Sequence, residues 1–272
     1  MFQLEFMRRA FLVGIMLSIV IPCIGVVMVN KRNSMIGDAL SHVSLAGVTI
    51  GLIFRVNPII TAIISCAIAS FSIEIMRRYF PKNSDISTAI MMSLGIGLAA
   101  VLSDFVKGAA NFNSFLFGSI VAISDFEVIL VTLVFFIVIT VFTVLYKALL
   151  YVSFDEVGAR LAGIKVQSVN IIFTFLISLS ISIASRTVGV LMVSSLMVVP
   201  VACALRVSKS YFQTVIYSIL FGMTFTISGI TISFYQGLKP GGTMVLTGIL
   251  VLFTIVILQN LRKLLKISRK SI

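Results

Sequence analysis

The sequence lacks most of the residues from which soluble enzymes build their sites. Its 272 residues include one histidine, three cysteines and no tryptophan, and only 11% of them are charged. A single histidine excludes the paired histidines of a zinc-protease helix, and no Gly-Lys pair is present to form a phosphate-binding P-loop. We therefore predict that the chain is not an enzyme and does not hydrolyse ATP by itself.

The few cysteines and the charge balance exclude two further classes. Cys23, Cys66 and Cys203 lie in three separate apolar runs, so no disulfide framework is expected and the thiols are predicted to be free and buried. The formal net charge of +12 comes from basic residues that lie between apolar runs. A nucleic-acid surface needs such residues gathered on one soluble face, so no nucleic-acid partner is predicted.

Hydrophobic residues make up 59% of the chain, which is more than a soluble core of this size could hide from water. We predict an all-α, polytopic membrane protein in which residues 1–272 form one integral membrane domain. A helix needs about 20 apolar residues to cross a bilayer, and nine segments approach that length, with eight spans as the alternative count. The segments are Ala10–Val29, Met35–Phe54, Ile59–Met76, Ile86–Val106, Phe126–Tyr146, Val169–Ala184, Val188–Leu205, Tyr211–Phe234 and Met244–Leu261.

The loops between these segments alternate in basic content, which predicts the orientation because lysine and arginine stay preferentially on the cytoplasmic side. The loops rich in lysine and arginine place the C-terminus in the cytoplasm and, with nine spans, the N-terminus outside. Arg8 and Arg9 oppose that placement of the N-terminus and fit better if one segment is re-entrant. The rich side holds Lys31, Arg32, Arg77, Arg78, Lys82, Lys147, Arg160, Lys165, Arg206, Lys209 and the tail from Arg262 to Lys270; the other side holds Arg8, Arg9, Arg55, Lys107, Arg186 and Lys239.

Several smaller features have structural interpretations. Glu74 precedes Arg77 by three residues and is expected to form an ion pair at a helix end, and Asp125 is expected to cap the fifth span. Gly95 and Gly97 are expected to allow close helix contact. Ser194 and Ser195 lie in an apolar run without a nucleophile motif, and they are interpreted as helix-packing serines.

The strongest functional signal is the only histidine, His42, which follows Asp38 by four residues. On a helix the two side chains share one face. Asp38 could simply cap a helix beginning near Ala39 and pair with Lys31 or Arg32, which would leave His42 as a polar packing residue. Alternatively the carboxylate and the imidazole form a two-ligand site for zinc or manganese, suited to transit because tight structural zinc sites use four ligands. From the pair alone both interpretations stay open.

Three segments resemble the membrane permease of bacterial ATP-binding-cassette importers for zinc, manganese and iron, and together they cover nearly the whole chain. The first, Arg32–Gly47, contains Gly-Asp-Ala-Leu-Ser-His and places Asp38 and His42 at the family's acid and histidine. The second, Phe154–Ile164, is similar to the family's short cytoplasmic coupling helix. The third, Arg186–Ala202, is similar to the family's helix with Val-Gly and a later Pro-x-Ala. Their order and spacing make coincidence improbable.

The resemblance implies the following assembly in a bacterial cell membrane. Two copies of the chain would form a pathway lined by Asp38 and His42, two separate ATPase subunits would dock below, and an extracytoplasmic metal-binding lipoprotein would deliver the ion. The metal would be cargo in transit, so no permanent cofactor is expected. Docking would use a coupling helix at about residues 153–163, through Asp155, Glu156, Gly158, Ala159, Arg160 and Gly163.

Zinc is the first expectation for the cargo. Ser-His-Val-Ser-Leu-Ala-Gly at Ser41–Gly47 and the segment Asn111–Ser119 look most like the Gram-positive zinc importers. The alternatives are a manganese or iron importer of the same family, an ion-coupled secondary carrier that uses Asp38 and His42 as a proton relay, and a purely structural membrane scaffold.

Overall fold

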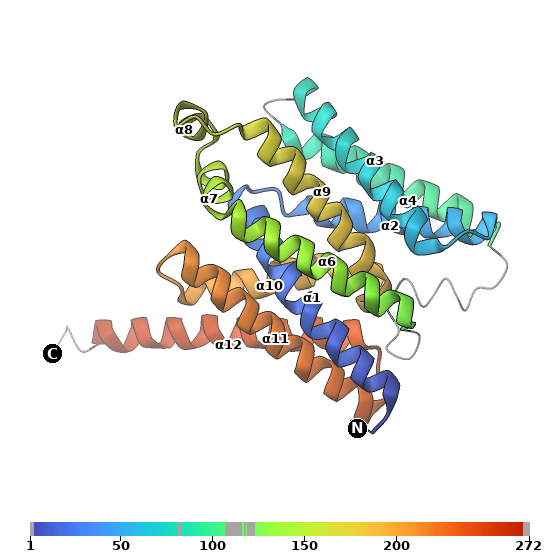
Figure 1. The fold of residues 1–272 in the computed structure, drawn as a ribbon. Helices are drawn as coiled ribbons and strands as arrows, with labels where there is room; N and C mark the ends of the chain where they lie inside the picture. The colour runs from blue at the N-terminus through green and yellow to red at the C-terminus, as the bar shows by residue number, and fades with distance from the viewer. Residues whose placement is uncertain (1–2, 81–82, 107–115, 117, 119–122, 269–272) are drawn as a thin grey trace.

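The computed structural model describes residues 3–80, 83–106, 116, 118 and 123–268, and within them the chain is helical (Figure 1). Of the segment Asn111–Ser119, only residues 116 and 118 belong to this part. The basic residues Lys82, Lys107 and Lys270 lie outside it. The elements are α1 (Glu5–Asn30), α2 (Met35–Phe54), α3 (Pro58–Tyr79), α4 (Ser84–Ser103), α6 (Asp125–Val144), α7 (Tyr146–Phe154), α8 (Glu156–Leu161), α9 (Val166–Ala184), the π-helix η1 (Ser185–Gly189), α10 (Val190–Val207), α11 (Tyr211–Gln236) and α12 (Pro240–Ser268).

The prediction of an all-α membrane protein with eight or nine spans is confirmed. Each of the nine apolar segments forms a helix, and eight helices of the described chain are long and apolar enough to cross a membrane. The ninth, α10, is a shorter apolar helix whose apolar stretch is Met192–Val207. It is shorter because η1 takes up the first residues of the predicted segment, Val188 and Gly189.

Successive helices run in opposite directions, so the molecule has two ends (Figure 1). The end that carries α8 also holds Lys31, which contacts Glu156, and Gln259 of α12, whose amide donates a hydrogen bond to the Arg206 carbonyl. We call this the α8 end. At the opposite end, the Arg9 end, Arg9 of α1 pairs with Asp125 at the start of α6. The N-terminus therefore lies at the Arg9 end, and α12 runs toward the α8 end.

Helix α2 lies in the interior of the bundle, surrounded by α3, α4, α9 and α10 (Figure 1). Its contact with α4 is close because Gly95 has no side chain: a Cβ there would lie 2.8 Å from the Val43 backbone nitrogen. The expectation of close helix contact is correct for Gly95 but not for Gly97. A Cβ at Gly97 would meet no described atom within 4 Å.

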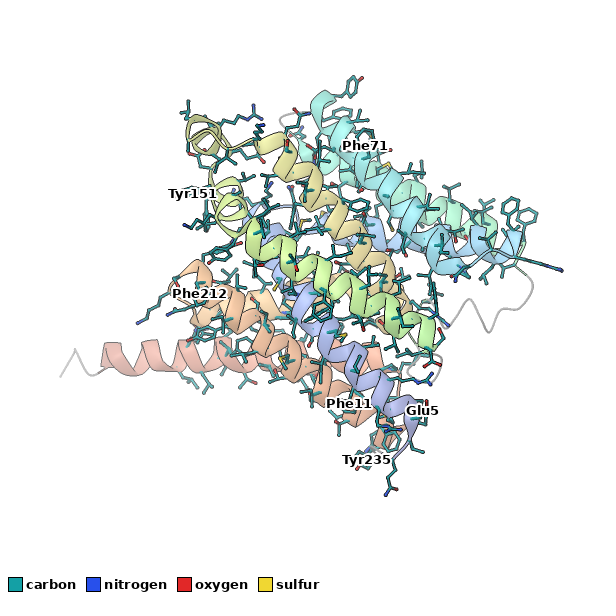
Figure 2. All side chains as sticks on the ribbon, viewed as in Figure 1. Glu5, Phe11, Phe71, Tyr151, Phe212 and Tyr235 are labelled. Atoms are coloured by element: carbon teal, nitrogen blue, oxygen red, sulfur yellow. The ribbon has the colours of Figure 1, made fainter. Side chains whose placement is uncertain are left out.

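The outer surface of the bundle is apolar, as a lipid environment requires. Phe71 of α3 and Phe212 of α11 project outward from it (Figure 2). The three cysteines are free and buried, as predicted.

Two helix-end predictions have different outcomes. Glu74 and Arg77 form the expected ion pair, with an N···O distance of 3.8 Å. The prediction that Asp125 caps α6 is wrong, because Ser124 is the N-cap and forms a capping box with Glu127. The sequence carried this signal, since Ser-x-x-Glu before an apolar run is the capping-box pattern.

Candidate functional site

Asp38 and His42 lie in the first half of α2, near the α8 end. The helix begins at Met35, so Asp38 belongs to its first turn and His42 to the next. At 1.5 Å per residue they lie about 5 Å and about 10 Å along the helix from its start. Both side chains are half-buried and share one helix face.

The contacts of Asp38 are not those of a helix cap. The N-cap position of α2 is Ser34, and Lys31 is engaged elsewhere. Instead, the hydroxyl of Ser194 on α10 donates a hydrogen bond of 3.1 Å to Asp38 Oδ1. Ser194 was expected only to pack between helices, so this contact with Asp38 was missed. A hydroxyl donor fixes one carboxylate oxygen and leaves lone pairs on both oxygens for a cation.

His42 occupies the strip of α2 between α4 and α10. Gly95 of α4 would place a Cβ 3.0 Å from the His42 carbonyl carbon, and Ser194 of α10 bonds Asp38 on the other side. In the described part of the chain no side chain or backbone group hydrogen-bonds to the imidazole. Helices α4 and α10 thus both pack near the pair, and among the described residues no lysine or arginine is bound to it.

Further along the same face of α2, toward the Arg9 end, the side chains are buried and apolar. Leu45 and Ala46 form a small cluster with Val190 of α10, and Leu116 packs against it. Thr49, one turn beyond, is completely buried. On this face of α2, the side chains of Asp38 and His42 are therefore partly exposed. The residues that follow them toward the Arg9 end are covered by apolar packing.

The donor set is small. Among the described residues no group of three or more His, Cys, Asp or Glu side chains is close enough to hold a metal ion. One carboxylate and one imidazole are ligands of borderline hardness that accept zinc and manganese alike. Such a pair can hold a divalent ion briefly, but it does not complete a four-ligand structural site.

The segment predicted as a coupling helix contains α8, six residues long, at the surface of the α8 end. Asp155 is its N-cap and accepts a hydrogen bond from the Val157 amide, and Gly163 follows its C-terminus with φ of +83°. The amide of Ile164 bonds to the Ala159 carbonyl, which completes a Schellman ending. These local signals explain why so short a segment is helical.

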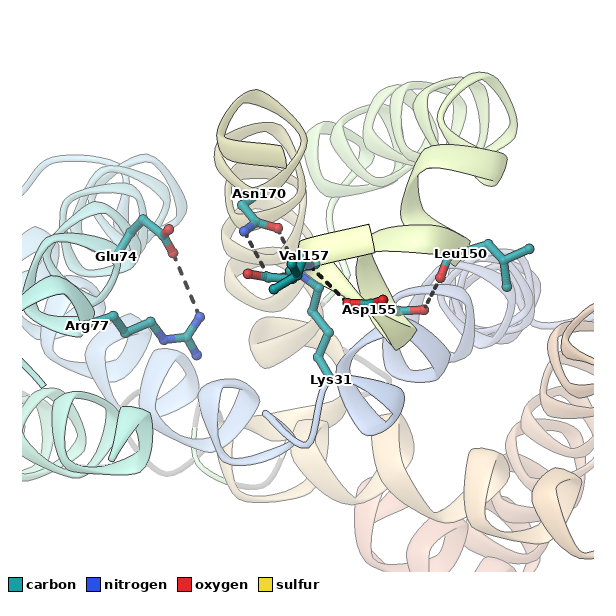
Figure 3. A network of polar contacts seen from close by, with 9 residues as sticks. Lys31, Glu74, Arg77, Leu150, Asp155, Val157 and Asn170 are labelled. Carbon is teal, nitrogen blue, oxygen red and sulfur yellow. Dashed lines mark hydrogen bonds and ion pairs between the residues drawn. The ribbon is translucent and has the colours of Figure 1, made fainter. Parts of the chain in front are cut away.

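Two faces of α8 differ in what they touch. Ala159 is buried against the bundle, whereas Gly158 lies against the Asp155 carboxylate of the helix's own N-cap. Val157, Arg160 and Leu161 point away from the bundle and are exposed. Glu156 contacts Lys31 and Asn170, in the network drawn in Figure 3.

A helical bundle with apolar walls, a half-buried acid and imidazole inside, and a short exposed helix at one end defines a membrane permease. The match to a family is specific: residues 3–259 fit the model of the ABC 3 transport family. The chain belongs to this family. It is therefore a multi-pass permease of the plasma membrane and not itself an enzyme, and the alternatives of a secondary carrier and a scaffold are set aside.

Several relatives are named for metal transport. A "probable metal transport system membrane protein" of Treponema pallidum is 34% identical, over 96% of this chain and 98% of its own length. The manganese transport system membrane protein MntC of Listeria monocytogenes is 27% identical over 92% and 90%. The high-affinity zinc uptake system membrane protein ZnuB of Haemophilus influenzae is 26% identical over 89% and 93%.

A solved structure has the same fold. The chain is similar to PsaBC from Streptococcus pneumoniae in complex with Fab, with a TM-score of 0.83 and 26% identity, over 93% of this chain and 91% of that one. Among the relatives given above, MntC is named for manganese and ZnuB for zinc.

Proposed function

We propose that this chain is the membrane subunit of an ATP-driven importer that moves a divalent transition metal ion, zinc in the first place and manganese as the alternative, into the bacterial cytoplasm. Asp38 and His42 bind the ion in transit. The observation that carries the proposal is a carboxylate and the single imidazole on one face of α2, both half-buried beside α10 and without a lysine or arginine bound to them in the described part of the chain.

The cost of placing these groups in a span supports a functional role. The cost of a carboxylate in a membrane helix is largest at the centre of the span, about 2.5 to 3.5 kcal/mol on insertion scales, and Asp38 in the first turn of α2 bears a smaller cost of the same kind. Ser194 offsets part of that cost through one hydrogen bond. A cation that neutralises Asp38 and binds His42 offsets more, and the two-ligand set lets it leave again.

Transport requires the path to open alternately to the two sides. The pair is partly open, and the apolar cluster of Leu45, Ala46, Val190 and Leu116 closes the same face of α2 toward the Arg9 end. We infer that this cluster separates the ion from the outer side while the pair is accessible from within. A second copy of the chain would complete the wall that one copy leaves open.

The partners follow from the same proposal. Two ATPase subunits dock on α8, whose exposed Val157, Leu161 and Arg160 offer an apolar contact and one charge. The α8 end is then cytoplasmic, with the C-terminus on that side and the N-terminus outside. A metal-binding lipoprotein delivers the ion at the Arg9 end. The basic loops near Lys31, Arg77 and Arg206 support this orientation.

Metal uptake in a strain that lacks the chain tests the proposal. Complementation with the wild-type chain should restore growth under zinc limitation, and uptake of radioactive zinc and manganese, measured separately and in competition, should identify the cargo. Asp38→Ala and His42→Ala should each reduce uptake by at least roughly tenfold, the effect of losing about 1.4 kcal/mol of binding.

The matched control for the acid is Asp85→Ala, which removes an exposed carboxylate from the first turn of α4. It should leave uptake unchanged. Normal uptake of both metals by properly inserted Asp38→Ala and His42→Ala chains would refute the assignment of the pair.

A further inference from the structure

The surface helix α8 is tied to the interior by three polar side chains from three different elements. Lys31, which follows the last residue of α1, places its ammonium 2.6 Å from Asn170 Oδ1 of α9 and 3.3 Å from Glu156 Oε1 of α8. Asn170 Nδ2 donates to the same Glu156 oxygen at 3.2 Å. We call these residues the inner triad (Figure 3).

The inner triad bridges a hollow. Helix α8 packs chiefly against α7 and α9, with Ala159 as its buried residue. Between the junction of α7 and α8 and the turn of residues 30–33 lies a cavity of about 500 Å³, and Lys31 and Glu156 both line it. Apolar packing therefore does not fill the space between α8 and this turn, and the ammonium of Lys31 spans it.

The turn to which Lys31 belongs is stiff and leads directly into α2. The Arg32 amide bonds to the Val29 carbonyl and the Asn33 amide to the Met28 carbonyl, a Schellman ending with Arg32 at φ of +56°. The Ile36 amide then bonds to the Asn33 carbonyl. Asp38 follows Lys31 by seven residues, so a displacement of this turn reaches the metal-binding face of α2.

The ammonium is held at an electrostatic cost. The Lys31 side chain is 11% exposed, and burial lowers its pKa although the Glu156 carboxylate acts in the opposite direction. Nearby Arg77 lowers the pKa further and Glu74 raises it. The Glu156 carboxylate is 47% exposed, and an ion pair with so exposed a partner contributes only about 0 to 1 kcal/mol. Stability alone therefore does not explain why a lysine occupies this position.

We propose that Lys31 is the positioning residue that links α8 to α2, so that a movement of α8 imposed by the ATPase shifts the helix carrying Asp38 and His42. This inference rests on the proposed function. Without Lys31, α8 keeps its packing on α7 and α9 but loses its connection to the turn before α2.

The test measures coupling, which a purely structural role would not change. The chain is assembled with its ATPase subunits in lipid vesicles and supplied with its metal-binding lipoprotein, and ATP hydrolysis and uptake of radioactive zinc or manganese are recorded on the same sample. Lys31→Met should leave hydrolysis within about twofold of wild type and reduce the metal moved per ATP about tenfold, within the range of typical coupling between sites.

Two rescue variants and one control sharpen the test. Lys31→Arg, and the exchange of charges in Lys31→Glu with Glu156→Lys, should recover most of the metal moved per ATP. Lys165→Met removes an exposed lysine at the same end, where it is the N-cap of α9, and should not change the ratio. A parallel fall of hydrolysis and uptake in Lys31→Met, or an unchanged ratio, overturns the inference.

A measurement on the full chain alone separates this inference from the proposed function. Spin labels on the exposed positions Val157 and Met35 report the distance between α8 and the start of α2. Lys31→Met should broaden that distance distribution, and an unchanged distribution overturns the link. If the wild-type complex moves neither zinc nor manganese, the proposed function fails; if it moves the metal while Lys31→Met keeps full coupling, only the present inference fails.

Discussion

The two halves of α2 differ in composition and, on one face of the helix, in surroundings. The half nearer α8 carries Asp38 and His42 on a face that is partly open, and its acid is bound to a serine of α10. On the half nearer the Arg9 end, Leu45, Ala46 and Thr49 of the same face are buried, and Gly47 lies close to α3. On this face the helix thus combines a polar, half-buried segment with a closed apolar one. Close packing of Gly47 against α3 anchors the second half, while Gly37 and Val43 pack the first half against α10 and α4.

The largest effect is expected from a carboxylate placed in the closed half. Ala46→Asp adds an acid to the face of Asp38 and His42 at a position that is 2% exposed. An unpaired carboxylate near the centre of a span should lower the free energy of unfolding by about 3 kcal/mol, measured by denaturant titration in detergent. Met35→Asp, at an exposed position of the same face, is the control and should cost much less. Equal losses would contradict the difference between the halves.

A smaller loss is expected from crowding the contact between α2 and α3. A Cβ at Gly47 would lie 2.8 Å from the Ala62 Cα, so Gly47→Val should push the helices apart and cost about 1 to 3 kcal/mol of unfolding free energy. Gly97→Val is the matched control, because no described atom lies within 4 Å of a Cβ there. If both variants melt alike in a thermal scan, the anchoring role of the second half is wrong.

A functional effect of moderate size is expected in the open half. Ser194→Ala removes the hydrogen bond to Asp38, worth about 1 kcal/mol. We expect the metal concentration for half-maximal uptake to rise about fivefold, with little change in the maximal rate because the ligands themselves remain. Ser195→Ala, one residue further along α10, should leave this metal concentration unchanged. A shift as large as that of Ser194→Ala would show that loss of the hydrogen bond to Asp38 is not the cause.

The smallest effect concerns the two turns that flank α2. Arg32 and Arg55 both have φ of +56°, a conformation that favours glycine. Arg32→Gly and Arg55→Gly should each raise the free energy of unfolding by about 0.5 kcal/mol. Glycine removes the strain of the left-handed backbone conformation, but it also loses more conformational entropy on folding, which offsets part of that gain. Lys165→Gly, at a φ of −74°, should lower it. Thermal unfolding that moves in the same direction for all three variants would contradict this explanation.

The sequence predicted the parts of the fold that depend on local composition. Apolar runs of sufficient length predicted the helices, and a spacing of four residues predicted that Asp38 and His42 share a face. The signals Asp155 and Gly163 predicted a short helix between them, and the structure has α8 within those bounds. The error at Asp125 was local too, because the capping-box pattern that begins at Ser124 was present in the sequence.

The rest of the site could not be predicted, because its contacts join residues far apart in the chain. Ser194 lies 156 positions from Asp38, and nothing in its own apolar run distinguishes it from Ser195. Lys31 was grouped with the basic loop residues, whereas its partners Glu156 and Asn170 are 125 and 139 positions away. Such contacts depend on how helices cross, which hydrophobic length does not encode.

The amino-acid sequence by itself determined that this protein lies in a membrane, which segments form its helices, and that Asp38 and His42 share one helix face. These properties follow from apolar length and from the 3.6-residue period, both of which act within one segment. Only the tertiary structure decided that a serine of α10 orients the acid, that an apolar cluster closes the helix face beyond it, and that a lysine connects α8 to α2. Those features arise where helices meet, so their positions are set by packing.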